Sequence, residues 1–153
     1  MTQPAAIDTE AENLLALENQ VCFALAVASR SVLALYRPIL EPLGLTHPQY
    51  LVMLALWEHS PRSVKEIGAA LQLEPATLSP LLKRLEATGY IRRERSTVDE
   101  RVLDITLTDA GHRLRDQAES IPPKIVSELG MSVDELTRMR ETLHAVIVAA
   151  TPA

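Results

Sequence analysis

The chain has a single cysteine, Cys22, and its thiol is the side chain most able to react with another molecule. Nucleophilic attack by cysteine requires the thiolate, and a free thiol is mostly protonated at neutral pH. A lone cysteine on an apolar helix is more often a small buried hydrophobic residue than a reactive one. Both interpretations of Cys22 stay open at this point. Because one cysteine cannot form an internal disulfide, the sequence predicts a reducing, cytoplasmic environment.

Other kinds of chemistry have little support in the sequence. The four histidines form no cluster with the cysteine or with closely spaced carboxylates, so we expect no metal site. There is no glycine-rich phosphate-binding loop, and we expect no cofactor. No apolar run approaches the roughly 18 residues that suggest a membrane span. The acidic N-terminus also lacks the basic start of a signal peptide.

The charge of the chain is unevenly distributed. The formal net charge is -5, which by itself argues against a nucleic-acid partner. Residues 1–61 carry six acids and two bases, whereas residues 62–95 carry seven bases and four acids. A local basic region on an acidic protein still predicts a polyanionic partner for that region.

Residues 75–88 have a helical apolar period with a small, basic polar face. At about 100° per residue, the leucines share one arc that faces a core. We expect Arg84 to fork onto a guanine edge and Lys83 to meet phosphate. An ordinary solvated face is the alternative. Since proline removes a backbone hydrogen bond inside a helix, the helix either bends at Pro80 or begins there. The residues expected to face DNA are Thr77, Ser79, Pro80, Lys83 and Arg84.

Two alternating segments, 90–95 and 102–107, predict the strands of a hairpin. A hairpin arm with arginine near its tip can enter a narrow minor groove, where the potential is most negative. Asp99 would repel phosphate, so we expect it to pair with nearby arginines and shape the loop. A charged hairpin that binds nothing is the alternative. The arginines expected to reach double-stranded DNA are Arg93, Arg95 and Arg101.

The remaining segments predict helices around this unit, which gives a mainly α fold with a small β wing. Residues 1–45 and 111–153 are expected to be dimerisation helices, and residues 46–110 a winged helix-turn-helix lobe. Long helices that are apolar on one side bury that side against another element. The simplest partner for these helices is the same pair of helices from a second copy of the chain. Helix starts are expected at Asp8 or Thr9, after Thr46, at Ser63, after Thr108 and at Ser132, with breaks near Pro38 to Gly44 and around Pro122 and Pro123.

Several segments together resemble the MarR superfamily of dimeric winged-helix repressors, and more narrowly its organic-hydroperoxide-sensing branch. The resemblance spans roughly residues 13–120. The segment Asn19-Gln20-Val21-Cys22-Phe23-Ala24-Leu25 is typical of the narrower branch. The other matching segments are Leu35-Tyr36-Arg37, Pro48 to Leu54, Ser63 to Gly68, Thr77 to Leu85, and Asp99-Glu100-Arg101.

The resemblance implies a homodimer held by its terminal helices, and a recognition helix that continues through Pro80. It also implies that Cys22 is the sensing residue. In the family two tyrosines hold the thiolate, one of them from the other subunit. The first maps onto Tyr36, but the second maps onto His47, which is a departure. Some relatives carry a second, resolving cysteine, and here Ser127 lies in that neighbourhood.

The expected function is therefore a repressor, not an enzyme, that binds a pseudo-palindromic operator and leaves it when an organic hydroperoxide oxidises Cys22. The first product would be a sulfenic acid. With no second cysteine, the next step must involve an outside low-molecular-weight thiol, which would form an adduct on Cys22, or a backbone nitrogen, or over-oxidation. One rival is a repressor of the same fold released by a small aromatic or phenolic ligand, with a structural Cys22. A second, weaker rival is a thiol peroxidase.

Overall fold

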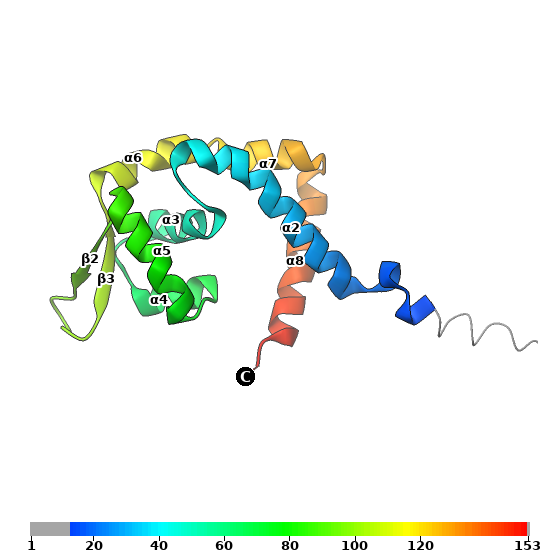
Figure 1. The fold of residues 1–153 in the computed structure, drawn as a ribbon, viewed down its shortest axis with the longest axis horizontal. Helices are drawn as coiled ribbons and strands as arrows, with labels where there is room; N and C mark the ends of the chain where they lie inside the picture. The colour runs from blue at the N-terminus through cyan, green and yellow to red at the C-terminus, as the bar shows by residue number, and fades with distance from the viewer. Residues whose placement is uncertain (1–12, 153) are drawn as a thin grey trace, which may run out of the picture.

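The computed structural model describes residues 13–152, which form helices and one small antiparallel sheet (Figure 1). The mainly α fold with a β wing is confirmed. The expected helix start at Asp8 or Thr9 lies outside the described residues. The elements in chain order are η1 (Leu17–Asn19), α2 (Val21–Leu40), η2 (Glu41–Leu43), α3 (His47–Glu58), β1 (Arg62–Ser63), α4 (Val64–Leu71), α5 (Pro75–Thr88), β2 (Ile91–Arg95), β3 (Leu103–Leu107), α6 (Asp109–Ala118), α7 (Ile121–Leu129) and α8 (Val133–Ala150).

The long N-terminal helix starts later than expected and ends within the break predicted near Pro38 to Gly44. It begins only at Val21, because Gln20 is extended at φ -86° and ψ 113° and separates it from the 3₁₀ turn η1. One uninterrupted helix through this region was therefore a wrong prediction. At the other end α2 continues past Pro38 to Leu40. The chain then turns at Gly44, whose φ of 72° lies in the left-handed region that glycine adopts without strain.

Hydroxyl side chains cap the helix starts that the sequence indicates. Ser132 and Glu135 form a reciprocal capping box at α8, and Thr46 forms one with Gln49 at α3. At α4 the Ser63 hydroxyl accepts a hydrogen bond from the Glu66 amide at 3.1 Å. These caps satisfy amide groups that have no partner within the helix, so they fix where each helix begins.

The sheet has the strand order β1-β3-β2, with antiparallel pairing throughout. The hairpin of β2 and β3 is the expected one, with Ile91 opposite Leu107 and Arg95 opposite Leu103. Strand β1 was not expected, because two residues carry no alternating pattern. It pairs with Asp104 and Ile105 of β3 immediately before α4 and so ties the wing to the helices.

The core lies inside the winged lobe, where α3, α4 and α5 pack with the sheet. Gly111 of α6 lies so close to the α5–β2 junction that a Cβ there would collide with the Tyr90 carbonyl oxygen. Trp57 of α3 donates its indole N–H to the Gly111 carbonyl at 2.9 Å. The largest fully buried side chains include Leu56, Ile67, Leu78, Leu85, Ile91 and Ile105.

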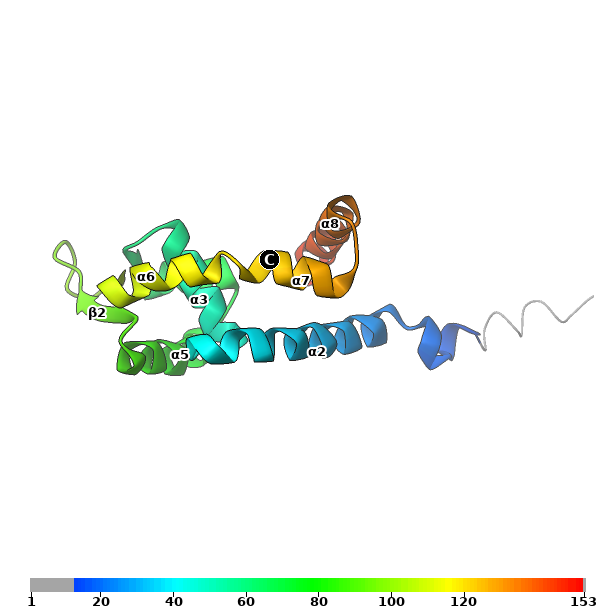
Figure 2. The same ribbon diagram turned by 90° about the horizontal axis from the view of Figure 1, so that it is seen from above.

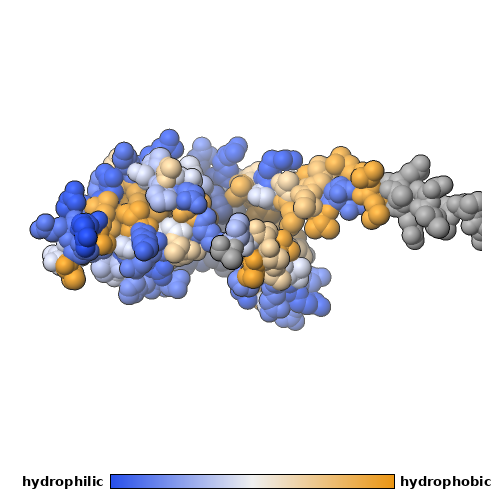
Figure 3. Space-filling model, turned by 90° about the horizontal axis from the view of Figure 1, so that it is seen from below, coloured by the Kyte–Doolittle hydropathy of each residue, from blue (hydrophilic) through white to orange (hydrophobic). Residues whose placement is uncertain are grey.

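Helices α2, α7 and α8 extend away from the lobe, on the side opposite the wing (Figures 1 and 2). Of the twenty residues of α2 only Leu40 is buried, and α8 has no buried residue. Figure 3 shows apolar side chains gathered over the N-terminal part of α2. The large exposed apolar residues on these helices and on η1 include Leu17, Val21, Phe23, Leu33, Val133, Met139, Val146, Ile147 and Val148.

Candidate DNA interface and thiol site

Helix α5 presents a basic face opposite its buried leucines. It begins at Pro75 and includes Pro80, so the helix continues through that residue rather than starting there. Thr77, Pro80, Lys83 and Arg84 are exposed, while Ser79 is half-buried. This arrangement leaves hydroxyl groups and cations on one accessible surface with little bulk, as a helix that enters a major groove requires.

The two cations of α5 have no acidic partner among residues 13–152. Neither Lys83 nor Arg84 takes part in an ion pair there. The guanidinium of Arg84 has five N–H donors in a planar fork, and the fork matches two acceptors on a guanine or a phosphate. The ammonium of Lys83 acts as a point charge and suits phosphate.

Arg93 is arranged differently, because it is bound to Glu86 of α5. Its guanidinium donates Nη2–H and Nε–H to Glu86 Oε1 at 2.8 and 3.0 Å, and its amide donates to Oε2 at 2.9 Å. The hydrogen bonds and charge of Arg93 hold the pKa of Glu86 below its usual value of 4.5. Arg93 therefore braces the recognition helix against the first wing strand, and only its remaining N–H groups are open to DNA.

The wing loop is closed by short-range hydrogen bonds. Asp99 accepts from the Arg101 amide at 3.1 Å and from the Arg101 Nε–H at 3.2 Å. These bonds hold the pKa of Asp99 below its usual value. The Ser96 hydroxyl accepts from the Val98 amide, and Arg95 donates to the Glu100 carbonyl at 2.9 Å. The loop thus keeps two arginines beside its tip, with the Arg101 side chain 91% exposed.

The thiol lies at the second residue of α2 and is exposed. Tyr36 is fourteen residues further along the same helix, which corresponds to about 21 Å at 1.5 Å per residue. One chain therefore does not bring Cys22 together with Tyr36. The thiol makes no hydrogen bond to any residue between 13 and 152, so contacts of the expected kind require a second chain.

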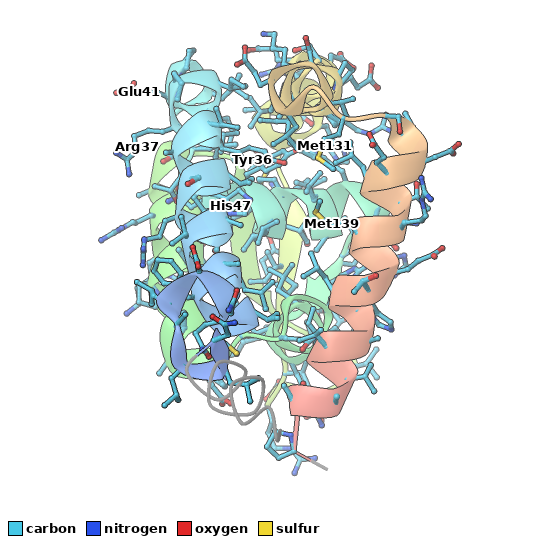
Figure 4. The ribbon with its side chains drawn as sticks, turned by 90° about the vertical axis from the view of Figure 1, so that its right-hand side faces the viewer. Tyr36, Arg37, Glu41, His47, Met131 and Met139 are labelled. Carbon is cyan, nitrogen blue, oxygen red and sulfur yellow. The ribbon has the colours of Figure 1, made fainter. Side chains whose placement is uncertain are left out.

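Tyr36 and His47 do lie together, in an aromatic cluster where α2 meets the start of α3. Their ring centroids are 4.7 Å apart in an edge-on arrangement. Tyr50 completes the cluster, with centroid distances of 5.8 Å to Tyr36 and 6.3 Å to His47. Figure 4 shows Tyr36 and His47 on the side of α2 that faces α8, with Met139 of α8 and Met131 of the preceding turn on the same side.

Burial sets the protonation states in this cluster. It raises the pKa of Tyr36 above 10.0, so the phenol keeps its proton at neutral pH. It lowers the pKa of His47 below 6.5, so the imidazole is mainly neutral at neutral pH. Both rings can then donate one hydrogen bond each, from the O–H and the N–H.

Three residues with roles in these sites were not expected from the sequence. Tyr50 completes the aromatic cluster, and Glu86 holds Arg93. Tyr90 donates its hydroxyl to the Leu43 carbonyl at 2.8 Å, across 47 positions of the chain. Glu86 and Arg93 are seven residues apart on two elements, and no periodic pattern marks such a contact.

The chain is similar to known regulators along most of its length. Residues 34–118 match the family model described as transcriptional regulator SarA/Rot. The organic hydroperoxide resistance transcriptional regulator of Bacillus subtilis is 42% identical over 131 residues, covering 86% of this chain and 89% of the relative. The HTH-type transcriptional regulator TtmR of Methylorubrum extorquens is 46% identical over 136 residues, covering 84% of this chain and 70% of the relative.

A solved structure shares both the fold and part of the sequence. Overoxidised AbfR bound to DNA, a protein of Staphylococcus epidermidis, has a TM-score of 0.74 and 37% sequence identity to this chain. The match covers 95% of this chain and 100% of the AbfR chain.

Proposed function

The chain belongs to the SarA/Rot family of transcriptional regulators, with a MarR-type winged-helix fold, and from this we propose that it is a homodimeric, redox-sensing repressor. It binds a pseudo-palindromic operator and leaves it when an organic hydroperoxide oxidises Cys22. The similarity to the Bacillus hydroperoxide-resistance regulator, over most of both chains, carries this proposal. An accessible thiol at the start of α2 supports it.

The DNA-binding part of the proposal rests on α5 and the wing. Helix α5 enters the major groove with Arg84 at base edges and Lys83 at phosphate. The hairpin arm carries Arg95 and Arg101 into the neighbouring minor groove, while Asp99 shapes the loop. A two-fold dimer places its two recognition helices about 34 Å apart, one turn of DNA, so each subunit binds one half of the operator.

The dimer is proposed because α2 and α8 leave apolar surface uncovered. By length and composition alone, the segment Val21–Leu43 would be apolar enough to cross a membrane, and its apolar surface is almost entirely unburied. In a DNA-binding regulator, burial of this surface against the same pair of helices from a second copy is a simpler explanation than burial in a membrane. We propose that residues 1–45 and 111–153 form the dimer and that residues 46–110 form the DNA-binding lobe.

In such a dimer each sensor site is shared by two subunits. The distance along α2 separates Cys22 from Tyr36 and His47 of its own chain. We therefore place the thiol of one subunit beside the partner's Tyr36 and the partner's His47. The phenol O–H and the N–H of the neutral imidazole can each donate to the sulfur, and hydrogen bonds to a thiolate favour the ionised form that attacks peroxide.

The proposed reaction transfers one oxygen atom to sulfur. The Cys22 thiolate attacks the terminal oxygen of the hydroperoxide, the O–O bond breaks, and an S–O bond forms. Sulfur loses two electrons and the peroxide gains them. The departing alkoxide takes a proton and becomes an alcohol, and Cys22 becomes a sulfenic acid. Because the chain has no second cysteine, we propose that a low-molecular-weight thiol of the cytoplasm then condenses with the sulfenic acid.

A hydrogen bond links the turn after α2 to the junction between the recognition helix and the wing. The hydrogen bond from Tyr90 to Leu43 joins η2, at the end of α2, to the junction between α5 and β2. A shift of α2 after oxidation is transmitted through this junction to the recognition helix and wing. We propose that the shift changes the spacing of the two DNA-binding lobes of the dimer and so releases the operator.

The test is Cys22→Ser, which removes the thiol and keeps a side chain of nearly the same size. The variant is expected to bind the operator like the original protein and to stay bound when organic hydroperoxide is added. Gel-shift titration, combined with mass spectrometry of the protein at each oxidant dose, measures both responses. Release of the variant at the original dose would refute the sensor role of Cys22.

The same measurements distinguish the rival functions. Release of Cys22→Ser by a phenolic compound would favour a repressor controlled by a ligand. Repeated consumption of hydroperoxide in the presence of a reductant would favour a peroxidase. The relatives are transcriptional regulators, and we propose that this chain consumes at most one equivalent of oxidant per thiol.

A further inference from the structure

Residues 13–20, the N-terminal hook, form a compact turn before α2 that is held by its own side chains. Asn19 donates its side-chain N–H to the Asn13 carbonyl at 2.6 Å, and Gln20 donates to the Ala16 carbonyl at 3.2 Å. Figure 1 shows the hook at the end of α2 farthest from the winged lobe. Its large apolar side chains are at least 62% exposed: Leu14, Leu15 and Leu17. The hook is therefore a pre-shaped apolar surface without a cover in its own chain.

A cavity of about 480 Å³ beneath the C-terminal half of α2 offers a matching apolar surface. Its rim is open, since Leu33 is 39% exposed. His47 lines the cavity and also contacts Tyr36, so the cavity adjoins the proposed sensor site. The apolar wall is formed by Leu33, Leu40, Leu45 and Pro48. Removing both apolar surfaces from water together is favourable.

The charges of the two surfaces are complementary. Arg37 lines the cavity, is exposed, and forms no ion pair among residues 13–152. Glu41 also lines the cavity but does not pair with Arg37. In the hook, Glu18 is exposed and forms no ion pair within the same described range. A carboxylate next to the exposed leucines thus matches a guanidinium at the edge of the apolar wall.

The two surfaces are too far apart to meet within one chain. Arg37 lies sixteen residues beyond Val21, the first residue of α2, which is about 24 Å along the helix. In the proposed dimer, however, Cys22 lies beside the partner's His47, which lines the partner's cavity. Glu18 precedes Cys22 by only four residues, or at most about 14 Å of chain. The hook of one subunit can therefore reach the cavity of the other.

We propose that the N-terminal hook of each subunit docks in the partner's cavity. Its leucines cover the apolar wall, and the Glu18 carboxylate pairs with the partner's Arg37. Docking fixes the start of α2 and so positions the Cys22 thiol beside the partner's His47. Each sensor site is then incomplete without the hook. This inference rests on the proposed function and adds a docking surface to the same site.

The first test reverses the charges of the pair. Glu18→Arg brings two cations together, and a two-fold dimer contains two such pairs, so the dissociation constant of the dimer is expected to rise about tenfold. At concentrations where the variant is still dimeric, oxidation of Cys22 by cumene hydroperoxide should be severalfold slower, because the thiol is less well positioned. Adding Arg37→Glu should restore both values. Sedimentation equilibrium and mass spectrometry of the trapped sulfenic acid measure them.

Arg30→Glu provides the matched control. Combined with Glu18→Arg, it gives the same net charge as the rescuing pair but places the new carboxylate on an exposed position of α2 outside the cavity. This combination is expected to restore neither dimer affinity nor the rate of oxidation. Equal rescue by Arg30→Glu and Arg37→Glu would mean that net charge explains the effect, and would refute the pairing.

The second test locates the hook by cross-linking in the full chain. Leu17→Cys and Leu33→Cys are combined with Cys22→Ser, so that a short bismaleimide can join only the two new thiols. Isotope-labelled and unlabelled subunits are mixed, and mass spectrometry of the linked peptides should show that the link joins two chains. Leu17→Cys with Val98→Cys, at the exposed tip of the wing, is expected to give no such link.

The outcomes separate this inference from the proposed function. If the original protein is monomeric, or if Cys22→Ser still leaves the operator on oxidation, the proposed function fails. If the original protein is a dimer that responds through Cys22, either of two results refutes the docked hook and leaves the sensor role in place. One is the absence of a link between chains, and the other is a failure of Arg37→Glu to rescue Glu18→Arg.

Discussion

At the scale of single residues, His47 differs chemically from the tyrosine that the resemblance leads one to expect. A neutral imidazole donates one hydrogen bond, as a phenol does, but it gains a charge in mildly acidic solution. Because burial lowers its pKa below 6.5, the native protein resists that charge. The stability contributed by the neutral ring is present above pH 6.5 and is lost as the pH falls toward its lowered pKa.

Arg84 is the residue on which sequence-specific DNA binding should depend most. Replacing Arg84 by alanine removes the guanidinium proposed to read a base edge, and is expected to weaken operator binding by about 1–3 kcal/mol. Binding to unrelated DNA should weaken much less. Gel-shift titrations on operator and on scrambled DNA, at one fixed salt concentration, measure both effects.

Arg113→Ala is the matched control for this prediction. It removes the same side chain from an exposed position of α6, away from α5 and the wing. Equal losses for the two variants would mean that net charge, and not base reading, explains the role of Arg84.

At the scale of elements, the contact between Glu86 and Arg93 fixes the angle between α5 and the wing. Glu86→Gln is expected to loosen β2 and weaken operator binding, because it removes the charged acceptor of three hydrogen bonds. The Arg93 amide should then exchange its hydrogen faster, which hydrogen-exchange measurements detect. Glu94→Gln is the control, since Glu94 is exposed and its 3.7 Å contact with Arg92 is longer.

The same pair gives a prediction about pH. The pKa of Glu86 is lowered in the folded protein, so its contribution to stability is present above its usual value of 4.5. That contribution is lost as the pH falls through the lowered folded value. Urea unfolding of Glu86→Gln should therefore show a smaller loss of stability below pH 4.5 than the original protein. Identical acid dependence in the two proteins would exclude Glu86 as a contributor.

The sequence predicted those elements that depend on local signals. Hydroxyl caps at Ser63 and Ser132 marked helix starts, and alternation marked both hairpin strands. It did not predict β1, which exists only through pairing with β3, nor the break at Gln20. It also did not decide whether the helix bends at Pro80 or begins there. Only the coordinates show that Tyr36 lies far from Cys22 along one helix while it packs against His47.

At the scale of the whole molecule, the proposed dimer depends on the apolar face of α8. Ile147→Glu puts a charge into this face and is expected to dissociate the dimer or weaken it strongly. Sedimentation equilibrium measures the change. Operator affinity should fall with it, because a single subunit engages only one half of the site.

Ala145→Glu adds the same group about half a turn away around α8, on an exposed position. This variant is expected to stay dimeric and to bind the operator normally. A dimer that survives Ile147→Glu as well would mean that α8 is not the main contact between subunits.

The separation of Cys22 and Tyr36 along α2 has one more consequence for the dimer. In the proposed dimer, each α2 would hold the sulfur of one sensor site at its start and the phenol of the other sensor site near its end. A displacement that starts at either thiol would then pass along one helix into the opposite sensor site. Oxidation of a single subunit is therefore expected to alter both sensor sites.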